Sequence, residues 1–149
     1  MKAKYSIRAL LYLARNRSAG KAIVRDIAQK EGIPQKFLEA ILLELRNEGI
    51  LQSKPGKGGG YTLGRPPDTI SLGRVVRMID GPLAPVPCVS QTAYAPCKDC
   101  PNEKTCVIRL VMKEVRDTHA KILDEITFAN LLQKESDLQS KIIPMDFEI

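Results

Sequence analysis

The chain has no tryptophan, a single histidine and only 5% aromatic residues. This scarcity argues against a carbohydrate-binding or aromatic-cage protein. No apolar run approaches the roughly 20 residues of a membrane-spanning helix. The first residues have the pattern of an amphipathic helix, not that of a secretion signal. We therefore expect a cytoplasmic protein with no membrane partner.

Residue patterns of common enzymes are also missing. Gly58-Gly59-Gly60 is not followed by the Lys-Ser/Thr of a nucleotide-binding loop. The Cys97-Lys98-Asp99-Cys100 motif lacks the βαβ context of a thiol oxidoreductase. No acid–base pair stands out, so we do not expect an enzyme.

The charge is unevenly distributed along the 149 residues, whose formal net charge is +6. Residues 1–65 hold 13 Lys and Arg against 5 Asp and Glu, whereas residues 66–149 hold 10 against 12. A basic first half indicates contact with a polyanion such as nucleic acid. From charge alone, a solvated basic face with no partner fits equally well.

Apolar periodicity and glycine positions predict a mainly α fold with a small β-hairpin wing. The predicted helices span 2–16, 25–31, 34–48 and 69–80, and the strands 22–24, 50–53 and 61–63. A short helix, a turn at Gly32, a longer helix and a glycine-rich hairpin follow the order of a winged helix-turn-helix. In that fold the second helix enters the major groove of DNA. The apolar stripe predicted to bury that helix is Phe37, Leu38, Ile41, Leu42 and Leu45.

Position in this pattern selects the candidate DNA contacts. The start of the reading helix supplies Gln35, Lys36 and Glu39, and the hairpin supplies Lys57, Gly58, Gly59 and Tyr61. Arg8, in the first helix, could contact a phosphate or only flank the core. Glu39 could accept a hydrogen bond from cytosine or be a solvated helix charge.

A long helix is predicted over 107–126, followed by a short one over 126–132. The long helix has a row of mainly apolar residues whose spacing alternates between four and three, as in a coiled coil: Ile108, Met112, Val115, His119, Ile122 and Ile126. Such a seam outside the first unit predicts pairing with a second copy, and it makes His119 an interface residue more readily than a ligand. The chain thus divides into a winged helix-turn-helix DNA-binding domain (1–81), a cysteine-rich loop (82–105), a dimerisation helix region (106–132) and a C-terminal tail without strong pattern (133–149).

All four cysteines lie in one proline-rich segment, with the spacing Cys88-x8-Cys97-x2-Cys100-x5-Cys106. Clustered thiols on a loop hold zinc or an iron–sulfur cluster, or form a thiol switch. The residues alone leave these three alternatives open.

Several segments follow one another in a familiar order: Tyr5-Ser6-Ile7-Arg8-Ala9-Leu10, Asp26-Ile27-Ala28, Gly32-Ile33-Pro34, Phe37-Leu38-Glu39, Leu45-Arg46-Asn47-Glu48-Gly49-Ile50, Gly58-Gly59-Gly60-Tyr61, the cysteine loop and Ile126-Thr127-Phe128-Ala129-Asn130-Leu131. Together they resemble the bacterial family of winged-helix regulators that includes IscR, NsrR and CymR. The resemblance covers residues 1–132. It implies a homodimeric repressor or activator that binds a roughly palindromic operator in double-stranded DNA.

The resemblance also implies an iron–sulfur cluster that senses iron, redox state or nitric oxide. Its ligands would be Cys88, Cys100 and Cys106, with [2Fe–2S] favoured over [4Fe–4S]. Arg109 stands where some members have a histidine ligand, so Cys97, which is extra in this chain, is the candidate for the fourth. The alternative is a metal-free thiol-switch regulator, or one with structural zinc, that responds to a metabolite or a partner protein.

Overall fold

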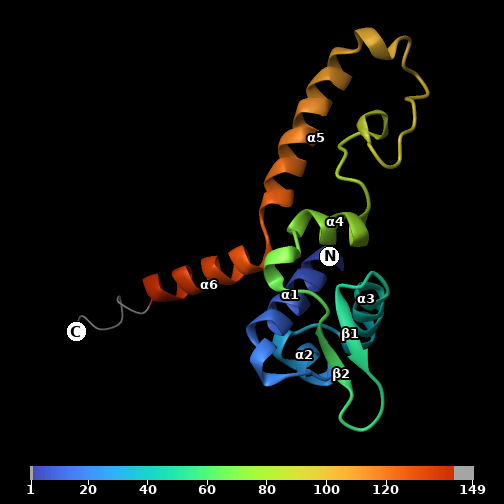
Figure 1. Ribbon diagram of the computed structural model, residues 1–149. Coiled ribbons are helices and arrows are strands. Elements are labelled where there is room, and N and C mark those ends of the chain that lie inside the picture. The colour runs from blue at the N-terminus through green and yellow to red at the C-terminus, as the bar shows by residue number, and fades with distance from the viewer. Residues whose placement is uncertain (1, 143–149) are drawn as a thin grey trace.

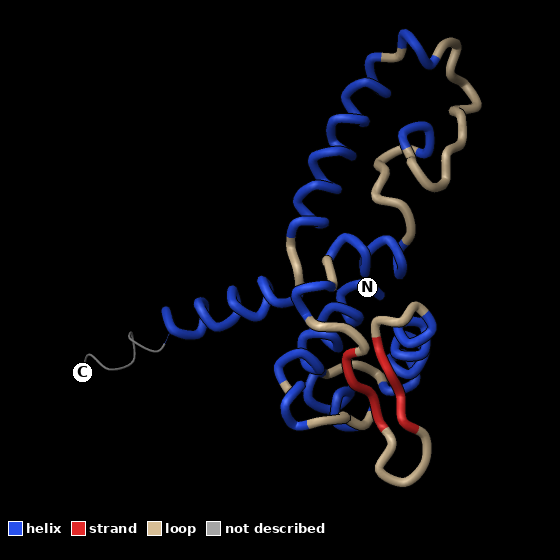
Figure 2. Tube along the Cα trace, in the orientation of Figure 1, coloured by secondary structure: helices blue, strands red, loops and turns tan. Residues whose placement is uncertain are grey.

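The structure is a computed structural model, and it describes residues 2–142 (Figure 1). Its helices are α1 (Lys2–Arg15), α2 (Val24–Glu31), α3 (Gln35–Asn47), α4 (Leu72–Asp80), α5 (Val107–Glu125) and α6 (Phe128–Ile142). Four 3-10 turns are present: η1 (Arg17–Ala19), η2 (Pro67–Thr69), η3 (Pro87–Val89) and η4 (Glu103–Thr105). The strands β1 (Leu51–Lys54) and β2 (Gly60–Leu63) form one antiparallel hairpin, drawn red in Figure 2.

Helices α1 to α4 and the hairpin form one packed unit, which we call the winged-helix unit (residues 2–81). Its core contains the apolar stripe of α3, with Leu38, Ile41, Leu42 and Leu45 fully buried. Phe37 was predicted to belong to this stripe, but it is 40% exposed and packs edge-on against the Tyr5 ring at 5.7 Å between centroids. Phe37 therefore lies at the edge of the buried face of α3, partly covered by the Tyr5 ring.

The hairpin is attached to the rest of the unit by a close backbone contact. Ala22 and Tyr61 exchange hydrogen bonds of 2.9 and 2.8 Å. A Cβ atom on Gly60 would lie 2.6 Å from the carbonyl oxygen of Ala22, so only glycine permits this approach. The strand predicted over 22–24 is reduced to this single bridge, because Val24 already begins α2.

Two corrections concern the helices α4 and α6. The helix predicted over 69–80 begins only at Leu72, because Thr69 belongs to η2 and the Ser71 side chain caps α4. Helix α6 continues to Ile142, so residues 133–142, predicted as part of a patternless tail, are helical. Thr127 and Asn130 cap its start reciprocally, which favours helix from that point on. The remaining predicted tail, 143–149, lies outside the described residues.

Helix α5 and the cysteine loop (residues 82–105) project from one end of the winged-helix unit, opposite the hairpin (Figure 1). No residue of α5 is buried. One face is half-buried toward α4 and the loop, and the other is exposed and apolar: Val107, Ile108, Val111, Val115 and Ile122. The predicted seam is thus partly displaced, since Met112 and Ile126 are half-buried within this chain and Val111 takes a place in the exposed face. No helix within residues 2–142 is long and apolar enough to cross a membrane.

Candidate functional site

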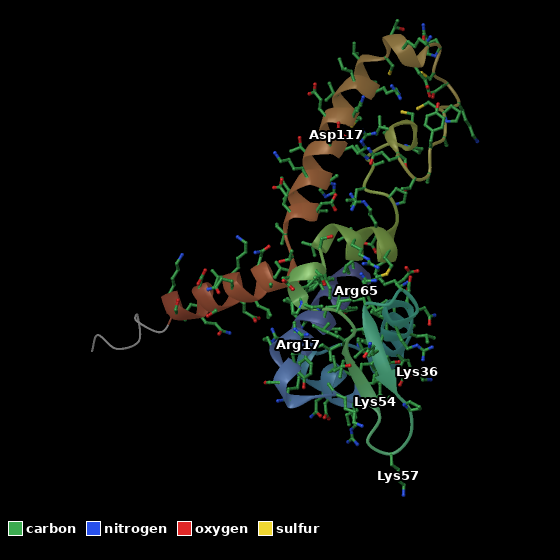
Figure 3. All side chains as sticks on the ribbon, in the orientation of Figure 1. Arg17, Lys36, Lys54, Lys57, Arg65 and Asp117 are labelled. Atoms are coloured by element: carbon green, nitrogen blue, oxygen red, sulfur yellow. The ribbon has the colours of Figure 1, made fainter. Side chains whose placement is uncertain are left out.

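Gln35, Lys36 and Glu39 are exposed at the start of α3, as a reading helix requires. The Gln35 amide nitrogen donates a hydrogen bond to a Glu39 carboxylate oxygen at 3.1 Å. The two side chains therefore present a linked donor–acceptor pair. Lys36 is exposed on the outer side of the same helix (Figure 3).

Two apolar side chains extend this exposed face, and the sequence prediction did not include them. Ala40 and Leu43 are exposed, Leu43 to 45%. Apolar groups in the major groove contact thymine methyl groups. The signal available in the sequence was that both residues fall outside the buried stripe of α3.

The four predicted wing residues have three different roles: one carries charge, two form the turn, and one packs at the base of the hairpin. Lys57 projects from the hairpin tip (Figure 3). Gly58 has φ +74°, and a Cβ atom on Gly59 would lie 2.4 Å from the Lys54 carbonyl oxygen, so both glycines are needed for the turn itself. Tyr61 is half-buried and holds the base of the wing. Of the four, Lys57 is the side chain free to meet a phosphate.

Another basic residue near the tip was missed. The Lys21 ammonium lies 3.7 Å from the point that a Cβ atom on Gly58 would occupy. Lys54 lies along the same hairpin (Figure 3). The excess of basic residues in the first half of the chain was the only sequence signal for this grouping.

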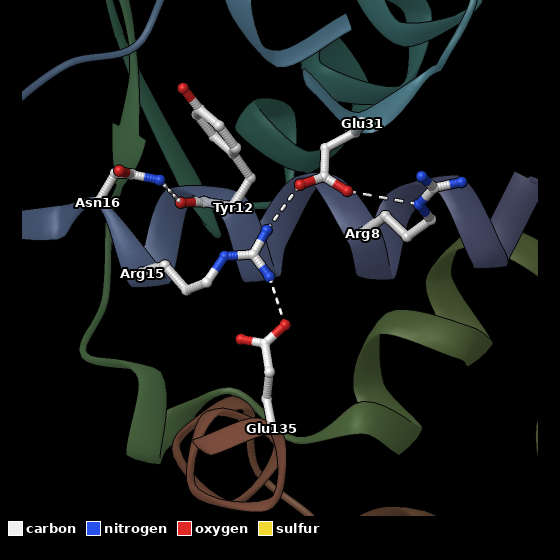
Figure 4. Close-up of polar contacts among 6 residues, drawn as sticks. All are labelled: Arg8, Tyr12, Arg15, Asn16, Glu31 and Glu135. Atoms are coloured by element: carbon white, nitrogen blue, oxygen red, sulfur yellow. Dashed lines mark hydrogen bonds and ion pairs between the residues drawn. The ribbon is translucent and has the colours of Figure 1, made fainter. Parts of the chain in front are cut away.

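Arg8 is engaged within the protein, as Figure 4 shows. Its Nε atom lies 3.4 Å from a carboxylate oxygen of Glu31, whose other oxygen lies 2.6 Å from Arg15. Arg15 also pairs with Glu135 of α6 at 2.6 Å. This network joins α1, α2 and α6, and a phosphate at Arg8 would have to compete with Glu31.

The cysteines differ in burial. Cys88, in η3, is 5% exposed, Cys97 is exposed, and Cys100 and Cys106 are half-buried. Cys106 is the N-cap of α5, where its sulfur accepts a hydrogen bond from the Arg109 backbone nitrogen at 3.4 Å. The state of that sulfur therefore bears directly on the first turn of the long helix.

Each thiol has another thiol as a neighbour. The pKa of Cys97 is raised, first by a hydrogen bond with Cys88. The pKa of Cys100 is raised by desolvation and by Cys106. Sulfur atoms gather between the loop and the start of α5 in Figure 3. The four predicted ligands are thus brought to one region.

Soft thiolate donors in this number suit an iron–sulfur cluster or zinc. Within residues 2–142, however, no three ligand side chains already have the spacing of a metal site. The donor set fits by its chemistry and location, and binding requires the loop to close around the metal. The raised pKa values also work against a highly reactive free thiolate.

One contact closes the cysteine loop on itself, and another joins the long helix to α4. The Tyr94 hydroxyl donates to Glu103 at 2.5 Å, which joins the two limbs of the loop and raises the pKa of Tyr94. Between α4 and α5, both terminal nitrogens of Arg77 contact the Asp124 carboxylate, at 2.5 and 2.8 Å. A Cβ atom on Gly73 would lie 2.1 Å from that carboxylate, so glycine permits the pair.

Comparison with known proteins gives one consistent family. A family model described as Rrf2, iron-dependent transcriptional regulator, matches residues 1–134. A protein of Rhodobacter capsulatus named as an rrf2-like HTH-type transcriptional regulator is 43% identical over 134 residues, which cover 88% of this chain and 89% of the relative.

Two solved structures share the fold. CymR of B. subtilis, described as the global cysteine regulator of that organism, has a TM-score of 0.73 at 29% identity, covering 90% of this chain and 95% of CymR. IscR of T. potens has a TM-score of 0.72 at 26% identity, covering 93% and 88%. The predicted winged-helix fold and the predicted family are confirmed.

Proposed function

The chain belongs to the Rrf2 family of DNA-binding transcriptional regulators, which are not enzymes, and from this premise we propose a homodimer whose operator affinity is controlled by a cysteine-bound iron–sulfur cluster. The observation that carries the proposal is the gathering of four thiols beside the start of α5. Thiols that converge on one place, at the end of a long helix, suit an inorganic centre with an effect on that helix.

DNA binding rests on α3 and the wing. Lys36, Lys57 and the basic side chains near the hairpin, Lys21 and Lys54, neutralise phosphates, which makes the affinity salt-dependent. Gln35 and Glu39, linked to each other, contact base edges in the major groove. Two copies related by a twofold axis place two such helices on the DNA, so the operator is roughly palindromic.

The second copy packs on the exposed apolar face of α5. Val111, Val115 and Ile122 are 51%, 47% and 54% exposed in the single chain. Apolar side chains in such a continuous row are usually covered in the working assembly. Pairing along α5 buries them and fixes the distance between the two reading helices.

Cys88, Cys100 and Cys106 would hold the cluster, and Cys97 would be the fourth ligand. When bound, the cluster would be a centre that is lost when iron is scarce or when oxidants or nitric oxide attack it. Cys106 caps α5, and α5 is joined to α4 by Arg77 and Asp124. A change in the conformation of the loop is therefore transmitted to the winged-helix unit through α5 and α4. If the chain with the cluster and the chain without it bind DNA unequally, this change alters the operator affinity.

Preparation without oxygen tests the metal assignment. We expect a coloured protein with iron and acid-labile sulfide, about two of each per chain for [2Fe–2S]. Cys106→Ala should lose the cluster and remain a folded dimer, and normal iron content in this variant would remove Cys106 from the ligands. A colourless protein with stoichiometric zinc would contradict the cluster proposal.

A second candidate is a regulator without a cluster, working by a thiol switch or with structural zinc. The pairing of Cys88 with Cys97 and of Cys100 with Cys106 favours it, because neighbouring thiols can form disulfides. The likeness to CymR is compatible with it. This candidate predicts that a mild oxidant changes the operator affinity of iron-free protein, and that a thiol reductant reverses the change.

A further inference from the structure

Cys88 has a support that the other cysteines lack. It lies in a buried triplet with Val89 and Ser90, which are 5%, 2% and 8% exposed in chain order. The following residues 91–99 are all exposed. One short stretch of the loop is therefore seated on the protein, and that stretch contains a proposed ligand.

Two arginines of α5 hold this stretch by its backbone. Arg109 Nε donates to the Cys88 carbonyl oxygen at 3.3 Å, and Arg116 Nη1 donates to the Val89 carbonyl oxygen at 2.5 Å. The arginines are seven residues apart, so they lie on the same face of the helix, about 10 Å from each other along its axis. The consecutive carbonyl groups of Cys88 and Val89 are therefore each hydrogen-bonded to a different turn of α5.

The burial of the Arg116 side chain explains why its guanidinium group makes these hydrogen bonds. Arg116 is only 14% exposed in its side chain, and a charge so covered needs strong acceptors. The Val89 carbonyl and the Asp117 carboxylate supply them. A charge-assisted hydrogen bond to a backbone carbonyl is stronger than a neutral one, so it restrains the peptide firmly.

The restraint is specific to Cys88. Within residues 2–142, no α5 side chain donates a hydrogen bond to the backbone of Cys97 or Cys100. Cys106 begins α5 itself and is held by the helix. Cys88 and Cys106 are thus fixed in relation to α5, whereas Cys97 lies in the exposed stretch 91–99 and the half-buried Cys100 follows it directly.

We propose that Arg109 and Arg116 are positioning residues that hold Cys88 in place on α5 before any metal arrives. Cys88 and Cys106 form the prepared half of the site, and the segment with Cys97 and Cys100 closes onto it. The role in metal binding rests on the proposed function. The anchoring of Cys88 does not, and it can be measured in metal-free protein.

The test is the alkylation rate of each cysteine in reduced, metal-free, full-length protein, followed by mass spectrometry with iodoacetamide as the probe. In Arg116→Gln we expect Cys88 to react about tenfold faster, the effect of losing one charge-assisted hydrogen bond. Cys97 serves as the internal reference and should keep its rate. Arg116→Lys, which retains a charged donor, should restore part of the protection.

Lys113→Gln is the matched control, because it removes one positive charge from an exposed position of the same helix. It should leave the Cys88 rate unchanged. An unchanged Cys88 rate in Arg116→Gln overturns the proposal, as does equal acceleration by Lys113→Gln. Faster reaction of Cys97 together with Cys88 would mean general loosening and would also overturn it. Arg109→Gln provides a second variant should Arg116→Gln fail to fold.

A second measurement connects the anchor to the metal. In anaerobically loaded protein, the cluster absorption of Arg116→Gln should decay in air several times faster than that of Lys113→Gln. Equal decay would overturn the role of the anchor in metal retention. If the parent protein takes up no iron and sulfide, the proposed function fails, while the alkylation result still decides whether Cys88 is anchored.

Discussion

The winged-helix unit and the arm formed by α5 with the cysteine loop are built on different principles. The unit buries a continuous apolar core, in which Leu10, Ile27, Leu38 and Leu42 are fully covered. The arm has no buried residue in its 19-residue helix and exposes a row of apolar side chains. The first region has a core of its own, whereas for the second we propose that a second copy of the chain covers the exposed apolar row.

The joint between the regions is well defined. Arg77 and Asp124 connect α4 to α5, and the backbone of Ile126 accepts a hydrogen bond from Leu72 at 2.8 Å. Phe128, the first residue of α6, is 1% exposed within the core of the unit. The arm is therefore rooted in the unit that carries the reading helix, so its position can influence DNA binding.

The largest effect is expected in the core. Leu42→Ala should reduce the free energy of unfolding by about 3 kcal/mol, because it leaves a cavity among packed residues. Leu43→Ala, its exposed neighbour, should change it by less than about 0.5 kcal/mol. Urea unfolding of both variants measures the difference, and similar losses would contradict the assignment of the two faces of α3.

The next effect concerns the arm. Val115→Asp puts a charge into the proposed pairing face, and we expect dimer dissociation to become at least about a hundredfold easier. The winged-helix unit should keep its helical circular dichroism. Lys113→Asp, on the other side of α5, should leave the dimer intact. Sedimentation equilibrium measures both, and an unaltered dimer in Val115→Asp would place the interface elsewhere.

The wing should contribute a smaller term. Lys57→Ala removes one phosphate contact, so the slope of log affinity against log salt should become shallower by about one. Lys121→Ala, on α5, is the control with the same charge change. Affinity titrations at several salt concentrations provide the slopes; if they coincide, the wing tip does not touch the DNA backbone.

The smallest effect is expected at the joint. Arg77 lowers the pKa of Asp124, so this pair stabilises the fold above the ordinary aspartate pKa, and the contribution is lost as the pH falls through the lowered value. Both side chains are about a third or more exposed, so screening limits the gain to about 1 kcal/mol or less.

Asp124→Asn should therefore destabilise the protein at pH 7, and the difference from the parent should shrink below about pH 4. Asp80→Asn, at an exposed position, serves as the control. A difference that stays constant as the pH falls would show that the carboxylate charge is not involved.

Local signals in the sequence predicted most of the fold. The apolar stripe of α3, the turn at Gly32 and the glycine-rich hairpin each depend on residues close together in the chain. The position of Leu38 inside follows from helical periodicity, and the position of Lys57 outside follows from the proline and glycines of the hairpin tip. The gathering of the cysteines in one loop was equally visible.

Features set by distant contacts were not predictable. Phe37 fits the helical stripe, and only the packing around Tyr5 shows that it stays partly exposed. Contacts with α4 and the loop determine which face of α5 is half-buried, so the predicted seam was partly misplaced at Met112. The contacts of Arg116 with Val89 and of Arg8 with Glu31 join residues 27 and 23 positions apart. No periodicity encodes such pairs.

The most direct test of the central claim is operator affinity of one anaerobic preparation, measured before and after removal of its cluster at constant salt. The account predicts that the two forms bind the same operator with clearly different affinity, and that Cys106→Ala binds like the emptied form. Equal affinity of the loaded and emptied dimers would contradict control by the cysteine-bound centre.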